Sequence, residues 1–198
     1  MPYSISFFML AVWHQSSNPR VAVRSRAMRV SVIGCSGAGK TTFGTALAAR
    51  LGIPFVELDA IFHQPGWTEL PAAEFRSRVR EKIAGDAWVV DGNYAAVRPL
   101  VLEQATTVAW LDYSRPRVMQ QVIRRSVSRT VTRRELWNGN REDARNWLKP
   151  DHPIRWAWAQ HGRKREEYAA RLAAPLYEAL DVHRFRAPRE ARAWVDSI

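Results

Sequence analysis

A glycine-rich run of nine residues constrains this chain more than any other stretch of its 198 residues. The run fits the pattern G-x-x-x-x-G-K-[ST] and consists of Gly34, Cys35, Ser36, Gly37, Ala38, Gly39, Lys40, Thr41 and Thr42. A β-branched apolar run from Val30 to Ile33 precedes it, and apolar residues at helical spacing follow from Phe43 to Leu51. The sequence therefore predicts a strand, a loop and a helix, which is the context that the pattern requires.

The spacing of this run suits the phosphate groups of a nucleotide. Its glycines let the backbone curl so that successive N–H groups point at one centre, and the following helix adds its positive end. Lys40 would reach the β- and γ-phosphates, and the hydroxyl of Thr41 would bind a magnesium ion that bridges them. We therefore expect the nine residues to bind ATP, with Mg²⁺ as a second cofactor.

Charge and cysteine content narrow the class of protein. The formal net charge is +11, and only four of the 30 basic residues are lysines. Because arginine holds phosphate with two parallel hydrogen bonds, we expect a polyanionic ligand. The single cysteine, Cys35, excludes an intramolecular disulfide, which fits a protein of the reducing cytoplasm. We expect Cys35 to fill its place in the loop as a small side chain rather than to act in redox chemistry.

Residues 1–27 differ in composition from the rest of the chain. An apolar stretch from Ile5 to Trp13 is too short to span a membrane, and three arginines without an acidic residue follow it. Met28 stands directly before the first predicted strand. We expect residues 1–27 to be a disordered extension or a mis-assigned start, and residues 28–198 to form a single domain.

Strand-like and helix-like segments alternate through residues 28–198, which predicts an α/β fold with a parallel sheet. Strands are predicted at 30–33, 54–58, 88–90, 107–111 and 182–185. Helices are predicted at 40–51, 71–83, 115–131 and 154–180 and from 188 onward, with a loop at 60–70. The polar, irregular segment at about 132–152 is predicted to be a lid.

Aspartates follow three of the predicted strands, at the sheet edge where open α/β proteins bind their ligands. We expect Asp91 to hold metal-bound water, because Gly92 leaves its surroundings open and the third strand should neighbour the first. Asp59 is the candidate base or acceptor anchor, since a carboxylate beside phosphate can take a proton from an acceptor hydroxyl. The alternative for each is a carboxylate that caps a turn or helix, and for Asp112 this is the favoured interpretation.

Residues 115–145 carry nine arginines against three acidic residues. One interpretation is a phosphate clamp, in which arginines on a mobile flap close over the nucleotide, cancel charge on the transferred group and exclude water. Another is that most of these arginines face solvent. A third is nucleic-acid binding, because basic stripes follow phosphate backbones, although the chain shows no recognised reading motif.

Several sequence blocks carry a family resemblance that spans essentially all of residues 28–198. They are 28–34, the glycine-rich run, Glu57 to Ile61 with Gly66 and Trp67, Trp88 to Tyr94, Trp110 to Tyr113 and Leu136 to Glu142. Together they resemble the bacterial adenylate-kinase-like P-loop proteins, which are often labelled the DNA topology modulation protein family.

This resemblance implies a three-layer P-loop NTPase fold of the nucleoside-monophosphate-kinase type, with a five-stranded parallel sheet and an arginine-rich lid. It also implies that Arg124 or Arg125 touches ATP, and that Arg133, Arg134 and Arg141 are lid arginines. True adenylate kinases, however, continue Asp-Gly with Phe-Pro-Arg, whereas this chain continues with Asn and Tyr at 93–94 and carries glutamine at 121. The resemblance therefore does not specify AMP as the acceptor.

The predicted function is phosphoryl transfer from Mg-ATP to a small-molecule acceptor by an ATP-dependent kinase. The predicted catalytic residues are Lys40, Asp59, Asp91, Arg125, Arg133, Arg134 and Arg141, and the predicted metal-binding residues are Thr41 and Asp91. His63, Trp67 and Tyr94 are candidates to line the acceptor pocket, with aromatic packing as the alternative. A nucleotide-dependent DNA-binding regulator and a slow ATPase are the competing functions.

Overall fold

A computed structural model of the chain describes residues 28–147, 149 and 152–198. Residues 1–27, the predicted extension or mis-assigned start, lie outside this described part, as do 148, 150 and 151 of the predicted lid. Within the described ranges, no helix is both long and apolar enough to cross a bilayer.

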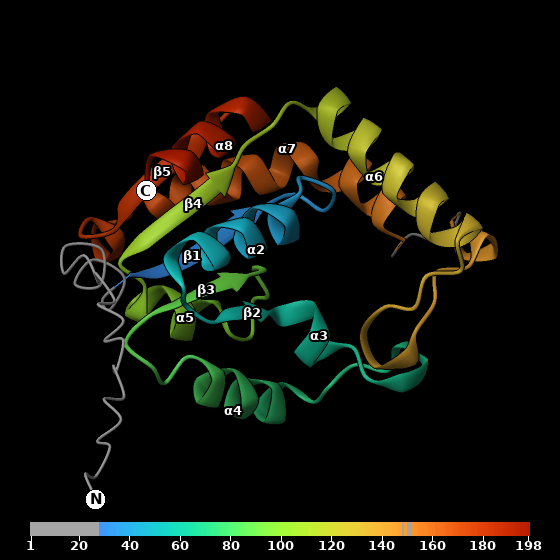
Figure 1. Cartoon of the computed structure of the whole chain (residues 1–198), viewed down its shortest axis with the longest axis horizontal. Coiled ribbons are helices and arrows are strands. Elements are labelled where there is room, and N and C mark those ends of the chain that lie inside the picture. Colours follow the sequence, from blue (N-terminus) through green and yellow to red (C-terminus); the bar gives the residue numbers. More distant parts are fainter. Residues whose placement is uncertain (1–27, 148, 150–151) are drawn as a thin grey trace, which may run out of the picture.

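Five parallel strands form one sheet in the order β2-β3-β1-β4-β5 (Figure 1). They are β1 (Arg29–Gly34), β2 (Phe55–Glu57), β3 (Trp88–Asp91), β4 (Thr107–Leu111) and β5 (Asp181–Phe185). The expected pairing of the first and third strands is confirmed, because Val32 of β1 lies in register with Asp91 of β3. β3 and β4 are buried along their whole length, since helices cover both faces of a parallel sheet.

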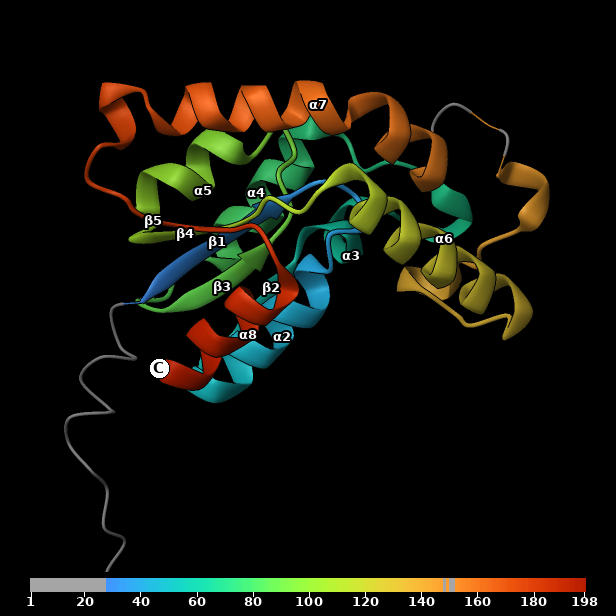
Figure 2. The same cartoon turned by 90° about the horizontal axis from the view of Figure 1, so that it is seen from above.

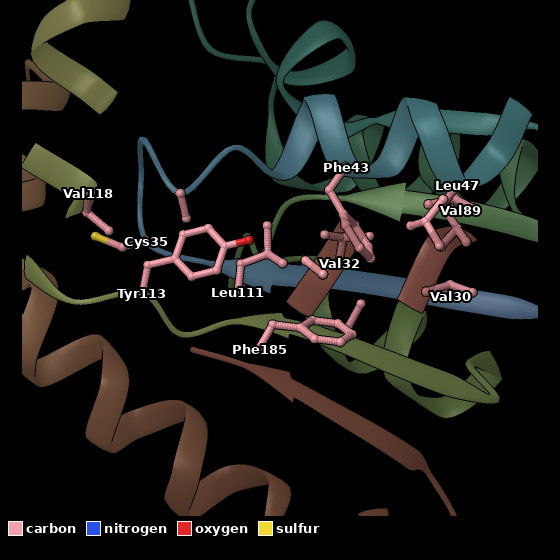
Figure 3. Packing of buried hydrophobic residues seen from close by; sticks show 14 of the residues in the cluster. Val30, Val32, Cys35, Phe43, Leu47, Val89, Leu111, Tyr113, Val118 and Phe185 are labelled. Carbon is pink, nitrogen blue, oxygen red and sulfur yellow. The ribbon is translucent and has the colours of Figure 1, made fainter. Parts of the chain in front are cut away.

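Helices on both faces of the sheet give the chain three layers (Figure 2). They are α2 (Lys40–Leu51), α3 (Leu58–Phe62), α4 (Ala72–Lys82), α5 (Arg98–Gln104), α6 (Arg115–Val131), α7 (Pro153–Leu172) and α8 (Pro188–Ser197). α2 and α8 lie on one face, where Figure 3 shows Phe43 reaching from α2 toward Val32 of β1 and Leu47 reaching toward Val89 of β3. On the other face, α5 and α7 pack on Ile33 and Trp110. The predicted α/β fold with a five-stranded parallel sheet is confirmed.

Two predicted segments differ from the structure. β2 ends at Glu57, and Leu58 begins α3 inside the stretch predicted as strand and loop. The chain turns into a helix there because Leu58 is buried against the core that α4 covers, and the carboxylate of Asp59 suits the positive end of a helix. The predicted helix at 154–180 ends with α7 and is followed by the 3-10 turn η4 (Pro175–Tyr177), since proline lacks the N–H that a helix interior needs.

The segment between α6 and α7 is irregular and reaches across to the turn that follows α3. It contains two 3-10 turns, η2 (Trp137–Gly139) and η3 (Ala144–Asn146). η2 packs on η1 (Pro65–Trp67), and in Figure 1 the orange segment lies beside the teal turn. The predicted lid therefore contacts the loop that carries Trp67, a candidate residue of the acceptor pocket. The role of the segment as a lid stays a prediction.

Candidate active site

The glycine-rich loop curls between β1 and α2. The N–H of Ala38 donates to the carbonyl of Cys35 across 3.1 Å, which closes a turn inside the loop. The ammonium of Lys40 lies 3.5 Å from the same carbonyl, so the lysine side chain folds back over the loop. A curled loop directly before a helix N-terminus is what the predicted phosphate site requires, and phosphate binding there stays a prediction.

Two glycines in left-handed conformations make this curl. Gly37 has a φ of +85°, and a Cβ at this position would lie 2.6 Å from the Cβ of Val122 in α6. Gly39 has the same φ but open space around it, and it stands directly before α2. The loop is therefore both curled and held close to α6, whose arginines the sequence predicts as a clamp.

Thr41 lies beside two carboxylates in the first turn of α2. Its hydroxyl is 2.6 Å from Oδ2 of Asp91 and 3.2 Å from Oε1 of Glu57, and it can donate its hydrogen to either. Burial raises the pKa of the Asp91 carboxyl, while the charge of Lys40 and the Thr41 hydroxyl act in the opposite sense. A hydroxyl and two carboxylates side by side form a donor set that suits Mg²⁺.

Glu57 is a member of this group that sequence reasoning missed. It lies in register with Asp91 on the neighbouring strand, so the two side chains project from the same side of the sheet. Its position two residues before the predicted acceptor anchor Asp59 was an available signal. Among the acidic residues, only the aspartates at the strand ends were considered as metal or acceptor residues, so Glu57 received no role.

Asp59 accepts a hydrogen bond from Tyr94. The Tyr94 hydroxyl lies 2.5 Å from Oδ1 of Asp59 and 3.4 Å from Nε2 of His63. Burial, and then the charge of Asp59, raises the pKa of the Tyr94 hydroxyl above its ordinary value. The phenol therefore stays protonated at neutral pH and acts as a donor. Two candidates for the acceptor pocket thus lie directly beside the candidate base.

A cavity of about 490 Å³ opens beside the loop. Its walls come from several parts of the chain and include Ser36 of the loop, Asp59 of α3, Trp67 of η1, Arg125 of α6 and Trp137 of η2. The structure therefore brings a loop residue, the candidate base and a predicted arginine to one space. None of the loop's other residues forms part of the wall.

The predicted lid arginines divide between the cavity and the solvent. Arg141 lines the cavity, and its guanidinium lies 3.7 Å from the carboxylate of Glu135. Arg124, Arg133 and Arg134 are exposed and lie outside the cavity wall. The predicted contacts of these three with ATP stay predictions.

Arg125 is the most buried of the predicted arginines. Its Nε is buried and has no hydrogen-bond partner among the described residues. Burial lowers the pKa of its guanidinium, and the charge of Arg129 acts in the same direction. Arg129 in turn lies 3.6 Å from Glu142 and 5.7 Å above the ring of Trp137. The cavity wall holds as many acidic as basic side chains, but the unpartnered Nε of Arg125 can donate to an anionic ligand.

Some residues of the cavity wall had no individual role in the sequence analysis. Arg129 was only one of the nine arginines of 115–145, and neither Glu142 nor His152 was assigned a role; Nε2 of His152 lies 3.1 Å from Oε1 of Glu142. Glu142 belongs to one of the resemblance blocks, but no spacing in the sequence links it to either partner. Only the fold brings the end of α6, the following segment and the start of α7 together.

Asp112 belongs to a different environment. Arg165 of α7 lies 3.0 Å from its carboxylate and Arg184 of β5 lies 2.7 Å from it. The guanidinium of Arg184 also covers the ring of Trp110 at 4.1 Å. The carboxylate thus joins β4 to β5 and α7 through ion pairs, a structural role that differs from the turn or helix cap that the sequence favours for Asp112.

The known proteins to which this chain is similar in sequence or fold include kinases. A family model described as shikimate kinase matches residues 36–72, and no curated protein matches the chain. The fold is similar to that of shikimate kinase from Acinetobacter baumannii in complex with shikimate, at 19% identity over 89% of this chain and 93% of that one, with a TM-score of 0.50. Shikimate kinase from Bacteroides thetaiotaomicron matches at 16% identity over 86% and 95% of the two chains, with a TM-score of 0.47.

The chain has the fold of a P-loop kinase. The matched stretch covers the end of the glycine-rich loop, α2, β2 and α3, which are the parts that carry Thr41, Glu57 and Asp59. The matched stretch is less than half of the chain, so the matches support a P-loop kinase fold but do not assign the chain to the shikimate kinase family.

Proposed function

We propose that this chain binds Mg-ATP through Gly34 to Thr42 and transfers the terminal phosphoryl group to a hydroxyl of a small molecule in the adjoining cavity. The observation that carries the proposal is the presence of Ser36 and Asp59 in the walls of one cavity. A phosphate-binding loop and a candidate base then face the same space, where two reactants can be held in line. Residues 28–198 would form one kinase domain, with 132–152 as its lid and a cytoplasmic location.

The first turn of α2 supports the magnesium part of the proposal. Asp91 is buried, so its charged form gains from a cation, and the Thr41 hydroxyl is an oxygen donor 2.6 Å away. Bound Mg²⁺ would supply charge neutralisation between the phosphates. Glu57 would add a second carboxylate to the donor set. Lys40 would leave the Cys35 carbonyl and place its ammonium on the β- and γ-phosphates.

The acceptor side follows from Asp59. Its carboxylate would take the proton of the acceptor hydroxyl as the hydroxyl oxygen forms a bond to the γ-phosphorus and the bond to the ADP oxygen breaks. Tyr94 donates to the Oδ1 atom and so orients the carboxylate. Arg125 and Arg141, both in the cavity wall, would offset the charge of the transferred group. The exposed lid arginines, Arg124, Arg133 and Arg134, would join them only on closure.

The class of acceptor is a small, anionic, hydroxylated molecule. The cavity has the volume of a metabolite site. Its acidic and basic side chains are equal in number, but the buried Nε of Arg125 has no hydrogen-bond partner among the described residues and can donate to an anion. The similar Acinetobacter baumannii kinase is described in complex with shikimate, a compound of this class. Shikimate is therefore the first acceptor to test, and sugar acids and AMP follow.

The resemblance to the DNA topology modulation proteins stays a prediction from the sequence blocks. The family model and the similar structures are kinases, which favours phosphoryl transfer over DNA binding. A slow ATPase activity is what the same site would show in the absence of an acceptor.

The proposal is tested by incubating the protein with Mg²⁺ and ATP labelled at the γ-phosphate, together with shikimate, gluconate, AMP or a metabolite extract. We expect label to appear in one acceptor, and we expect Lys40→Ala to abolish this transfer while the circular dichroism spectrum stays unchanged. A wild-type protein that binds ADP but labels no compound would refute the kinase proposal, and unchanged ADP affinity in Lys40→Ala would refute the nucleotide site.

A further inference from the structure

Two asparagines join the segment after α6 to the turn after α3. Asn140 is 4% exposed, and its side chain makes two hydrogen bonds with that turn. Its Oδ1 accepts from the backbone N–H of Trp67 at 2.9 Å, and its Nδ2 donates to the carbonyl of Gln64 at 2.9 Å. A buried amide paired in this way holds two backbones in one register, because separating them would leave polar groups unpaired.

Asn138 makes the second connection. Its Nδ2 donates to the carbonyl of His63 at 2.6 Å and lies 3.3 Å from the carbonyl of Ala60. Its own backbone is left-handed, with a φ of 56°, a conformation that asparagine tolerates better than most residues. We call Asn138 and Asn140 the clasp. The clasp reaches Ala60, the residue directly after Asp59, so it acts on the short helix that carries the candidate base.

Three aromatic rings meet where the clasp holds the two segments together. The rings of His63 and Trp137 lie 5.8 Å apart and are nearly parallel, and Trp67 meets both edge-on at 5.4 and 6.4 Å. All three line the cavity, so together they form an aromatic wall in it. Trp137 comes from the predicted lid, whereas His63 and Trp67 come from the turn after α3.

We propose that the tip of the predicted lid, residues 136–141, is part of the acceptor site rather than a free cover over the nucleotide. Trp137 contacts the apolar face of the acceptor, and the clasp asparagines are positioning residues that keep the aromatic wall and α3 in place. This proposal rests on the proposed kinase function. It implies that residues 60–68 and 136–141 move as one unit.

Amide hydrogen exchange tests the clasp in the protein alone. In Asn140→Ala, exchange in residues 60–68 should become roughly tenfold faster, because two hydrogen bonds to a buried amide are lost. Asn146→Ala, in the same segment but with no side-chain hydrogen bond to another described residue, should leave it unchanged. Asn138→Gly keeps the left-handed backbone while it removes the side chain, so it serves if Asn140→Ala fails to fold. Unchanged exchange in both clasp variants would overturn the clasp.

Steady-state kinetics with the labelled acceptor test the role of Trp137. Trp137→Leu should raise the acceptor KM by roughly tenfold and leave the ATP KM unchanged, because the lost aromatic contact is on the acceptor side. Trp137→Phe should restore most of the loss, and the exposed Trp158→Leu should behave as wild type. A raised ATP KM with an unchanged acceptor KM would overturn the proposal. If no compound is phosphorylated, the kinase proposal fails, while hydrogen exchange still decides whether the clasp exists.

Discussion

The hydroxyl of Thr41 and the carboxylate of Asp91 lie 2.6 Å apart, although 50 positions separate them in the chain. The pair forms because β3 runs beside β1 and ends next to the first turn of α2. The carboxylate is buried there, so its charge is costly until a cation arrives. Because Asp91 is both buried and beside an oxygen donor, the variant Asp91→Asn should differ from wild type in magnesium-dependent binding and in the pH dependence of its stability.

The first measurement concerns magnesium. In Asp91→Asn, we expect the affinity for ADP in the presence of Mg²⁺ to fall by roughly tenfold or more, because a charged donor to the metal shell is replaced by a neutral amide. Isothermal titration calorimetry with and without a chelator measures this. Without Mg²⁺, the variant and the wild type should bind ADP equally. Equal affinity in the presence of Mg²⁺ would rule out the metal role.

The second measurement concerns pH. Burial raises the pKa of the Asp91 carboxyl in the folded protein, so the folded state binds this proton more tightly than the unfolded chain does. The stability that this proton supplies is present below the unfolded pKa and is lost as pH rises through the raised folded pKa. Without Mg²⁺, Asp91→Asn should therefore be more stable than wild type at neutral pH, with a gain that shrinks on acidification. Urea denaturation across this range measures it, and a variant less stable at neutral pH would contradict the raised pKa.

The parts of the fold that the sequence predicted depend on local patterns. The glycine-rich run is bounded by a β-branched strand and a helical repeat, so its context could be read within about twenty residues. α3 and the clasp are different. α3 is a single turn and a half stabilised by the burial of Leu58, and Asn140 meets Gln64 from the far side of a long helix. Neither leaves a periodic signal, because the energy comes from contacts between distant segments.

Gly37 and Gly39 have the same left-handed backbone conformation, but only Gly37 has close neighbours. Alanine variants of the two therefore separate the cost of backbone strain from the cost of steric overlap. Gly39→Ala should cost about 1–2 kcal/mol, the usual penalty for a Cβ in this backbone conformation, since nothing lies near the added atom. Gly37→Ala should cost more, because its Cβ would lie 2.6 Å from Val122 of α6 in addition to the same strain. Denaturant unfolding of both variants measures the difference. Equal losses would show that the loop does not pack closely on α6.

Tyr94→Phe removes the donor to Asp59 while the ring and its packing stay. We expect the rate of phosphoryl transfer to fall by roughly tenfold, because the carboxylate loses the hydrogen bond that orients it. ADP affinity should not change, since the hydrogen bonds and ring contacts of Tyr94 within the described part of the chain are with Asp59, His63, Phe62 and Phe75 rather than with the loop. Tyr177→Phe, in η4, is the matched control. A normal transfer rate in Tyr94→Phe would remove this tyrosine from the site.

Cys35 supplies a readout of loop burial, because it is the only cysteine in the chain. Burial raises the pKa of its thiol above the ordinary value, although the charge of Lys40 acts against this. Since only the thiolate reacts with iodoacetamide, the native protein should be alkylated roughly a hundredfold more slowly than the urea-unfolded chain at neutral pH. Its rate should also keep rising at alkaline pH after that of the unfolded chain has levelled off. Mass spectrometry follows the single adduct, and native labelling as fast as unfolded labelling would mean that the loop opens freely in solution.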